Sequence, residues 1–401
     1  MRLRWATSAP VSIALGVAVG IAVVLSGAAL SRDHPTAQSR PRHTSSPSAI
    51  VTDRPPKANT ILLAWAAGGL PARTQAVLEK HRGVIDATTV LAGLDWIDRS
   101  HASDGAVIDK PPHGLAIPFE MAFVDPVAYR AFVPVADRQT VESLRPDELL
   151  LARTEAGLRG AGEGLTINLS GRHERVAGVV SDQATQGYEA LAAGHPPNSW
   201  LHPDRYVLLR VNKKTNEDSI ARAIRKLLPN HAPVRVKAQG ETPFLRYGDA
   251  VLPQMLYKKT FGEFAARPTA DGRLDIDPKW IARNIVRARV PLLGTVECHR
   301  LMIPQLRRAL REIRAEGFGY QIDPAQFAGC FSPRFISSDP RSRLSHHAWG
   351  AAIDLNAAEN RFGARPTMPR SIVQIMERNG FTWGGRWIVP DGMHFEWARF
   401  P

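Results

Sequence analysis

An uncharged apolar run at residues 11–30 constrains this chain more than any other feature. Its length of about 20 residues matches a membrane-spanning helix and exceeds the usual core of a secretory signal, about 7–15 residues. Arg2 and Arg4 precede the run, and positive residues keep that end of a span in the cytoplasm. We therefore expect residues 1–10 inside the cell, a transmembrane anchor at residues 11–30, and everything later outside. The alternative is a cleaved signal and a secreted protein, since "SGAAL" offers small residues for cleavage.

The cysteines fit an extracytoplasmic location. Cys298 and Cys330 are the only two in the sequence. Outside the membrane such a pair is typical of one disulfide. It would close a loop of about 33 residues and contribute about 3–4 kcal/mol in the chain-entropy model. The rival interpretation, two zinc ligands, is disfavoured because their spacing fits no common zinc finger.

The chain is strongly basic, with a formal net charge of +13 at pH 7. This balance favours anionic partners such as phospholipid head groups or anionic wall polymers. A compositional bias towards arginine and alanine explains the charge equally well. The sequence shows no motif for binding nucleic acid, and export argues against it, so we predict no nucleic-acid partner.

The length of 401 residues exceeds one ordinary domain. Residues 31–58 are rich in Pro, Ser, Thr and Arg without apolar periodicity, which indicates an extended linker. In residues 59–250 the order strand, helix, strand occurs twice, beginning at "TILLAW" and at "YVLLRVN", around the β-rich insert "GEGLTINLSGRHERVAGVVSD". This pattern predicts an α+β domain. It loosely resembles the extracytoplasmic core domain of macrolide-exporter-type ABC permeases. It shows no catalytic constellation, so we expect a binding or spacer role with an unidentified protein partner.

Residues 251–277 are expected to connect this domain to a second one at residues 278–401. Two amphipathic helices are predicted there, at "CHRLMIPQLRRALREIRAEG" and "MPRSIVQIMERNG". Short strands are predicted around them, at "GYQID", "CFSPRF", "AAIDLN" and "MHFEWA".

The stretch "SHHAWGAAID", residues 345–354, contains two adjacent histidines. On a strand, adjacent side chains point to opposite faces, so His346 and His347 cannot both serve one site there. Gly350 would supply a bend. Beyond the bend, Asp354 shares one face with Ala352, while the aliphatic residues between and after them face a core.

A second cluster, "GFTWGGRWIVPDGMHFEW", supplies Asp391 and His394. Two imidazoles and a carboxylate, here His347, His394 and Asp354, are typical of a catalytic zinc site whose fourth position stays open for water. A further carboxylate outside the metal shell is then needed to take the proton from the water and pass it to the leaving amine. Asp391, which follows Pro390 at a turn, suits that role.

These residues resemble the signature of the zinc D-alanyl-D-alanine carboxypeptidase and L-alanyl-D-glutamate endopeptidase family, of the vancomycin-resistance and phage-endolysin type. The signature is S-x-H-x-x-G-x-A-x-D followed by acid-x-x-H. It matches Ser345, His347, Gly350, Ala352, Asp354, Asp391 and His394. The resemblance extends over about residues 280–401. It implies that His347, Asp354 and His394 hold Zn²⁺ and that His346 does not. It also implies that Asp391 is the general base.

The resemblance adds further site residues. Arg334 in "CFSPRF" occupies the place of a family arginine near the scissile carbonyl, where a guanidinium would stabilise the developing oxyanion. If "MHFEW" is a strand, Glu396 shares a face with His394 and supports that ligand. Ser345 is a candidate for contact with substrate. Trp383 and Trp387 either wall the groove or pack in the core. Many carboxypeptidase members carry Glu at the position of Asp391, and the shorter acid occurs in the endopeptidase branch.

The predicted fold class is therefore α+β. A C-terminal zinc peptidase domain, with a small antiparallel sheet and flanking helices, follows a separate α+β domain and an N-terminal transmembrane helix. The expected function is hydrolysis of amide bonds in peptidoglycan stem peptides, of the D-Ala-D-Ala carboxypeptidase or L-Ala-D-Glu endopeptidase type. The alternative is a non-catalytic cell-wall-binding or scaffold protein that retains the peptidase fold. A decayed enzyme would be expected to lose a ligand or the acid, and all of them are present.

Overall fold

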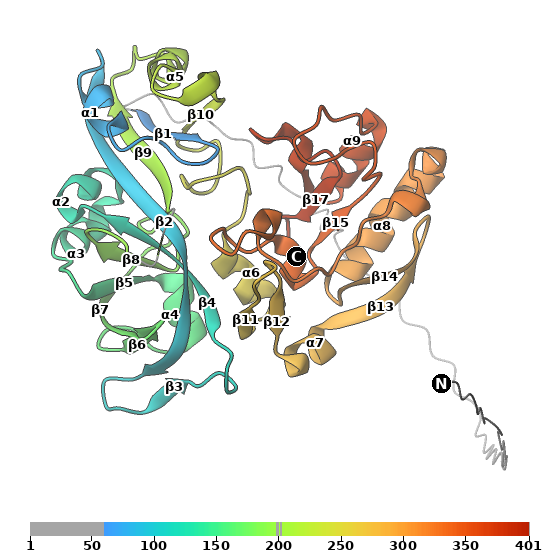
Figure 1. Ribbon diagram of the computed structural model, residues 1–401, viewed down its shortest axis with the longest axis horizontal. Helices are drawn as coiled ribbons and strands as arrows, with labels where there is room; N and C mark the ends of the chain where they lie inside the picture. Colours follow the sequence, from blue (N-terminus) through green and yellow to red (C-terminus); the bar gives the residue numbers. More distant parts are fainter. Residues whose placement is uncertain (1–59, 198–199, 201–202, 401) are drawn as a thin grey trace, which may run out of the picture. The chain divides into compact units, whose positions relative to one another are not determined.

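The computed structural model describes residues 60–197, 200 and 203–400, which belong to one compact unit (Figure 1). The anchor predicted at residues 11–30 and the linker at residues 31–58 lie outside this described part. Within it, no helix combines the length and the apolar character that a membrane crossing requires. Two regions are named below: the sheet region, residues 60–250, and the C-terminal region, residues 251–400.

The sheet region is built on one large mixed sheet (Figure 1). The strands follow the order β10-β1-β9-β2-β4-β8-β5-β7-β6, and β3 pairs with the end of β2. Because β6 pairs with both β7 and β2, the far part of the sheet closes on itself around a core of inward-facing apolar side chains. The bounds are β1 (Thr60–Ala66), β2 (Val84–His101), β3 (Val107–Asp109), β4 (Ile117–Val124), β5 (Glu148–Ala152), β6 (Thr166–Leu169), β7 (Arg172–Val180), β8 (Ala190–Ala193), β9 (Asp204–Val211) and β10 (Val234–Ala238).

The first half of this sheet confirms the two predicted strand–helix–strand units. The units β1-α1-β2 and β9-α5-β10 interleave as β10-β1-β9-β2, with antiparallel neighbours, in a split β-α-β arrangement. Leu78 of α1 (Thr74–Glu79) and Ile220 and Ile224 of α5 (Glu217–Arg225) pack on the same face of the strands. The insert between β2 and β9 carries the remaining helices of the region, which are α2 (Pro126–Tyr129), α3 (Arg138–Glu142) and α4 (Arg153–Arg159).

The C-terminal core begins earlier than residue 278. The segment predicted as a connection contains α6 (Gln254–Phe261), β11 (Ala266–Pro268) and β12 (Leu274–Ile276), and α7 (Pro278–Asn284) follows. Tyr257, Phe261 and Phe264 lie in the same hydrophobic core as the later helices. Tyr257 and Phe261 lie four residues apart on one stripe of α6, and Phe264 follows the end of the helix, so residues 251–277 contribute to the core and do more than connect.

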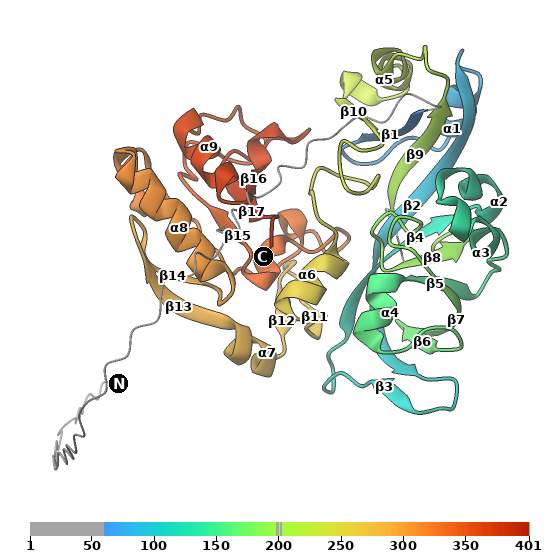
Figure 2. The same ribbon diagram turned by 180° about the vertical axis from the view of Figure 1, so that it is seen from behind.

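The two predicted amphipathic helices are confirmed as α8 (Met302–Ala315) and α9 (Arg370–Arg378). Helix α8 lies along the hairpin of β13 (Ile285–Val290) and β14 (Gly294–His299), and α9 lies beside β16 (Figure 2). The small antiparallel sheet is also present, in the order β15-β17-β16, with bounds β15 (Ala352–Asp354), β16 (Phe381–Trp383) and β17 (His394–Trp397).

Two of the predicted short strands do not form. "GYQID" contains a 3-10 turn at Gly319–Gln321, and "CFSPRF" makes only isolated bridges, Arg273 with Arg334 and Phe335 with Leu344. Glycine at 319 and the Asp323–Pro324 pair favour turns, and Pro333 has no N–H for a strand ladder.

The predicted disulfide between Cys298 and Cys330 is confirmed, with Cα atoms 5.3 Å apart. Both residues are buried. The bond ties β14 to the segment that runs from Cys330 through Arg334 towards the candidate site.

Candidate active site

The segment around the two histidines is a 3-10 turn, η7 (His346–Trp349), so the strand alternation considered for His346 and His347 does not apply. Ser345 caps the turn, because its Oγ accepts a hydrogen bond from the backbone N–H of His347 at 3.4 Å. Gly350 ends the turn at φ +63°, where an added Cβ would lie 2.7 Å from the backbone nitrogen of His299. Only glycine fits that conformation and approach, and the chain then turns into β15.

Pairing of β15 with β17 brings the second half of the site together. In the antiparallel register Asp354 lies opposite His394, and Ala352 lies opposite Glu396. Side chains directly opposite each other project from the same face. The pair between them, Ile353 and Phe395, faces the hydrophobic core. One face of the two strands therefore carries two carboxylates, those of Asp354 and Glu396, and the imidazole of His394.

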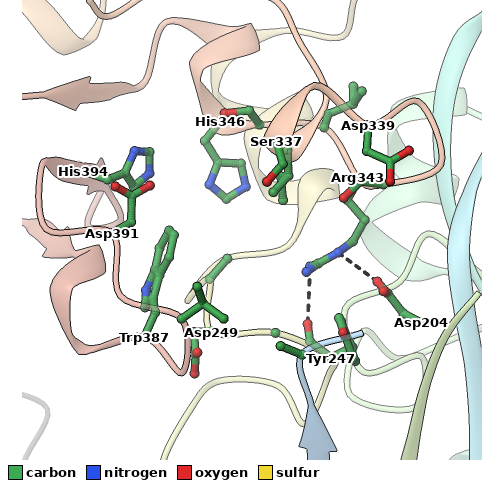
Figure 3. Close-up of a pocket in the computed structure, with 18 of the residues that line it drawn as sticks. Asp204, Tyr247, Asp249, Ser337, Asp339, Arg343, His346, Trp387, Asp391 and His394 are labelled. Atoms are coloured by element: carbon green, nitrogen blue, oxygen red, sulfur yellow. Dashed lines mark hydrogen bonds and ion pairs between the residues drawn. The ribbon is translucent and has the colours of Figure 1, made fainter. Parts of the chain in front are cut away.

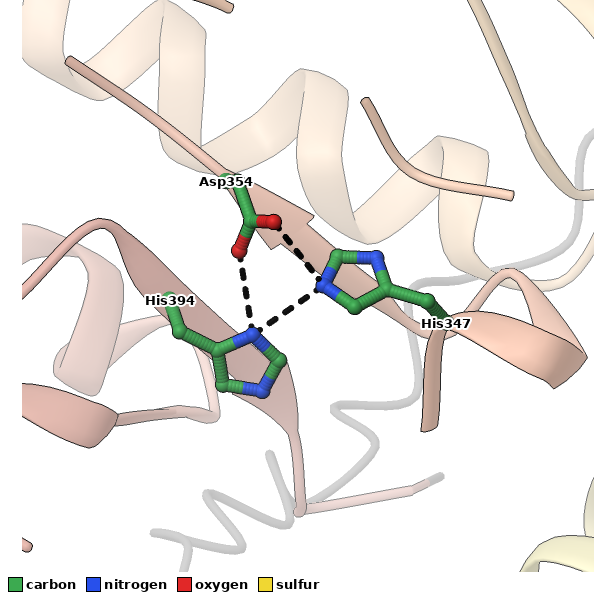
Figure 4. Close-up of side chains that lie close together, drawn as sticks. All are labelled: His347, Asp354 and His394. Carbon is green, nitrogen blue, oxygen red and sulfur yellow. Dashed lines mark hydrogen bonds and ion pairs between the residues drawn. The ribbon is translucent and has the colours of Figure 1, made fainter. Parts of the chain in front are cut away.

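His347, Asp354 and His394 converge, as Figure 4 shows. His347 Nε2 lies 3.1 Å from His394 Nδ1 and 3.2 Å from Asp354 Oδ2. His394 Nδ1 lies 3.0 Å from Asp354 Oδ1. All three side chains are buried. We call these three residues the donor cluster.

The outer ring nitrogens fix the tautomers of both imidazoles. His347 Nδ1 lies 2.8 Å from the carbonyl oxygen of Cys330, and His394 Nε2 lies 3.3 Å from Glu396 Oε1. Each outer nitrogen therefore donates its N–H to an acceptor, and the inner nitrogens present lone pairs. Two ring nitrogens and the carboxylate of Asp354 then face one another, an arrangement that a proton or a metal cation between them stabilises.

The pKa shifts in the donor cluster also favour a positive charge between these side chains. Burial alone would lower the pKa of His394, but hydrogen bonds and charge from Asp354 and Glu396 raise it to about 10. Burial alone would raise the pKa of Asp354, but the two imidazoles of the donor cluster hold it well below its usual range. The protein surrounds these side chains with groups that favour positive charge at their centre.

The donor set fits zinc. Zinc binds imidazole nitrogen and carboxylate oxygen at about 2.0–2.2 Å with tetrahedral geometry, which separates the donor atoms by roughly 3.3 Å. The observed separations of 3.0, 3.1 and 3.2 Å are close to that value. Three protein donors leave one tetrahedral position for water or substrate.

Asp391 lies on the turn that leads into β17. Gly384 allows this turn, because a Cβ there would lie 2.8 Å from the carbonyl oxygen of Asp391. The indole Nε1 of Trp383 donates to the carbonyl of Gly392 at 2.8 Å and holds the same turn. The buried Oδ1 of Asp391 has no hydrogen-bond partner among the described residues. Burial raises the pKa of this carboxyl, which suits a group that both accepts and releases a proton.

Arg334 follows the disulfide and lines the same cavity as Asp391. Its carbonyl accepts from the backbone N–H of Ser345 at 3.1 Å, which fixes it beside the η7 turn. Its guanidinium makes no ion pair with any residue in the described part of the chain, and its charge acts on the pKa of Asp391. A guanidinium with free donors in this position is available to bind a substrate oxygen.

His346 belongs to the site without joining the donor cluster. Its Nδ1 lies 3.2 Å from Glu396 Oε1, and its ring stacks on Tyr257 with centroids 3.8 Å apart. Glu396 therefore lies between His346 and His394. The two adjacent histidines do point to different partners, but because of the η7 turn and not because of strand alternation.

A cavity of about 650 Å³ opens beside the cluster (Figure 3). The C-terminal region lines it with Arg334, Ser345, His346, Trp387, Asp391, His394 and Glu396, among others. Trp387 lies on this wall, whereas Trp383 is not among the lining residues. The opposite wall comes from the sheet region and includes Trp65, Asp204, Tyr247 and Asp249. Sequence reasoning missed that wall, and no motif marks it.

Comparison with known proteins gives one family. Residues 338–397 match a protein family described as D-alanyl-D-alanine carboxypeptidase, which supports a peptidase domain of this kind at the C-terminal end. The matched segment contains the donor cluster and Asp391. No curated protein matches the chain.

Three solved structures show distant similarity. The periplasmic region of MacB from Actinobacillus actinomycetemcomitans is 12% identical, and the match covers 45% of this chain and 88% of that one, with a TM-score of 0.30. A domain of a putative permease protein from Porphyromonas gingivalis is 15% identical over 45% of this chain and 86% of that one, with a TM-score of 0.29. The extracellular domain of the noncanonic ABC-type transporter YknZ from Gram-positive bacteria is 11% identical over 44% of this chain and 99% of that one, with a TM-score of 0.29.

Proposed function

We propose that this chain is a zinc-dependent peptidase that hydrolyses amide bonds in peptidoglycan stem peptides. One observation carries the proposal: the donor cluster, with its inward lone pairs, lies at a cavity whose wall carries the unpartnered carboxylate oxygen of Asp391. The donor cluster would hold a zinc ion, which would supply Lewis acidity and lower the pKa of a bound water.

The protein's own residues perform the proton transfer and stabilise charge. Asp391 accepts a proton from the attacking water at Oδ1 and delivers it to the nitrogen of the scissile amide as the C–N bond breaks. Arg334 donates hydrogen bonds to the oxygen of the scissile carbonyl, where negative charge develops. Glu396 holds the ring of His394 through Nε2–H and so fixes the orientation of that donor.

The substrate is a stem peptide cut either as by a D-Ala-D-Ala carboxypeptidase or as by an L-Ala-D-Glu endopeptidase. The volume of about 650 Å³ lies within the range of about 300–1,000 Å³ for ligand pockets and admits several residues of a peptide. Aspartate at position 391 favours the endopeptidase branch by family resemblance. The disulfide favours an extracytoplasmic location. We propose that the chain is anchored through residues 11–30, with secretion after signal cleavage as the alternative.

Mass spectrometry of muropeptides tests the proposal. The purified chain, loaded with zinc, is incubated with a muropeptide digest in the presence and absence of a chelator. Loss of a terminal alanine identifies the carboxypeptidase, and cleavage after the first residue of the stem identifies the endopeptidase. A chain that binds zinc and leaves every muropeptide intact would refute the enzyme and favour a wall-binding role.

A further inference from the structure

The sheet region contacts the loop that carries Arg334. We call this loop, residues 334–345, the arginine loop. Arg343 Nε lies 3.1 Å from Asp204 Oδ2, and Nη1 donates to the carbonyl of Tyr247 at 3.3 Å (Figure 3). Gly248 stands at φ +91°, and an added Cβ would lie 2.6 Å from Arg343 Nη2. The guanidinium therefore sits in a fitted recess of the sheet region.

This contact reaches groups of the proposed catalytic centre through backbone hydrogen bonds. The carbonyl of Arg343 accepts from the N–H of Ile336 at 2.9 Å, two residues after Arg334. The N–H of Ser345 donates to the carbonyl of Arg334 at 3.1 Å, and Ser345 Oγ caps the N–H of His347. Holding Arg343 therefore holds the backbone of the segment that carries Arg334.

The sheet region also contacts the loop that carries Asp391. We call this loop, residues 384–391, the aspartate loop. The N–H of Ile388 donates to Asp249 Oδ2 at 2.6 Å. Arg235 Nη2 donates to the carbonyl of Arg386 at 3.0 Å. The carboxylate of Asp249 is buried, and Lys237 Nζ lies 3.4 Å from its other oxygen. Asp249 is therefore held in place within the sheet region, and it fixes the aspartate loop at Ile388, three residues before Asp391.

We infer that the sheet region is a clamp across the proposed catalytic cavity, in which Asp204 and Asp249 are positioning residues for Arg334 and Asp391. The inference rests on the proposed function of those two groups. The sheet region contacts both loops. It therefore sets the distance between the guanidinium of Arg334, which stabilises the oxyanion, and the carboxylate of Asp391, which moves the proton. A misplacement of about 1 Å at a reacting centre can cost about 100-fold in rate.

Full-length variants loaded with zinc test the clamp. Asp204→Ala removes the partner of Arg343, and Asp249→Ala removes the acceptor for Ile388. Each should lower kcat by about 10-fold or more, with zinc content equal to that of the parent. Asp249→Asn retains an oxygen acceptor for Ile388 and should restore most of the rate. The matched control is Asp86→Ala, which breaks the pair with Arg210 elsewhere in the same sheet region and should leave kcat unchanged.

Amide hydrogen exchange gives a second readout that needs no activity. Exchange should become faster in the aspartate loop of Asp249→Ala and in the arginine loop of Asp204→Ala, and in neither loop of the Asp86→Ala control. Parental kcat together with parental exchange would overturn the inference. Loss of zinc from either variant would also overturn it, because these acids would then act on the metal site itself. A zinc-loaded parent without hydrolysis would refute the proposed function, and the exchange result would still decide whether the clamp exists.

Discussion

Asp391→Asn isolates proton transfer from metal binding. The amide has nearly the shape of the carboxylate but cannot accept the proton from water. Oδ1 of Asp391 has no hydrogen-bond partner in the described structure, so the substitution breaks no bond at that atom. The backbone contacts of the turn, Asp391 N–H to the carbonyl of Gly384 at 3.0 Å and His394 N–H to the carbonyl of Asp391 at 3.2 Å, do not involve the side chain. The donor cluster therefore keeps its geometry.

The expected effect is a fall in kcat of about 10²–10⁴-fold, the usual contribution of a positioned general base. At about 1.36 kcal/mol for each factor of ten, this raises the barrier by about 3–5 kcal/mol. Zinc content and the midpoint of thermal unfolding should stay at the parental values. Hydrolysis of a purified stem peptide, followed by chromatography, together with metal analysis of the same sample, measures both quantities.

The pH dependence gives an independent check. Burial raises the pKa of Asp391, and the base works only when deprotonated. The rate of the parent should therefore fall as the pH drops through a pKa above the ordinary aspartate value of about 3.9. Asp391→Asn has no proton to gain there, so its residual rate should lose that acidic limb.

Asp339→Asn is the matched control, because it makes the same substitution in another aspartate that lines the cavity. Asp339 pairs with Arg341 and lies on the arginine loop. Its rate should stay within a few-fold of the parent. The assignment would be wrong if Asp391→Asn lost zinc or cleaved the peptide at the parental rate. Glu396 would then be the next acid to test.

Three further variants probe the rest of the site. Alanine at any member of the donor cluster should strip the zinc, measured by metal analysis, whereas His346→Ala should keep it along with most of the activity; full zinc in all the cluster variants would refute the ligand set. Arg334→Ala should keep zinc and the acidic limb but lose about 10²–10³-fold in kcat, as expected for an oxyanion donor, and an unchanged kcat would exclude that role. Replacing both Cys298 and Cys330 by alanine should lower the free energy of unfolding by about 3–4 kcal/mol in denaturant titrations, and an unchanged value would contradict the loop-entropy argument.

The local periodicity of apolar residues predicted the helices that pack through one stripe of side chains. In α8, Leu306, Leu310 and Ile313 repeat at helical spacing and are buried together. The turn around His346 was less predictable, because a 3-10 turn of four residues is too short for a side-chain period to identify it. The 3-10 turn forms because Ser345 caps it and because Gly350 approaches β14 closely.

The second wall of the cavity could not be predicted from the sequence at all. Asp204 and Arg343 are far apart in the chain, and each is an ordinary charged residue in its own segment. Their contact exists only because the sheet region packs against the C-terminal region. Motifs report residues that act together within one segment or family pattern, and they carry no signal for partners that meet by docking.

The adjacent histidines have a common purpose that the structure makes visible. Burial alone would raise the pKa of Glu396, but its contacts with His346 and His394 hold that pKa below the usual range, so the buried carboxylate stays charged. A charged Glu396 is the acceptor that fixes the ring of His394 with its lone pair turned inward. His347 thus supplies a donor atom directly, while His346 contacts the carboxylate that orients another donor. This division of roles explains why His346→Ala should disturb the orientation of His394 far less than loss of Glu396 would, since the carboxylate itself remains.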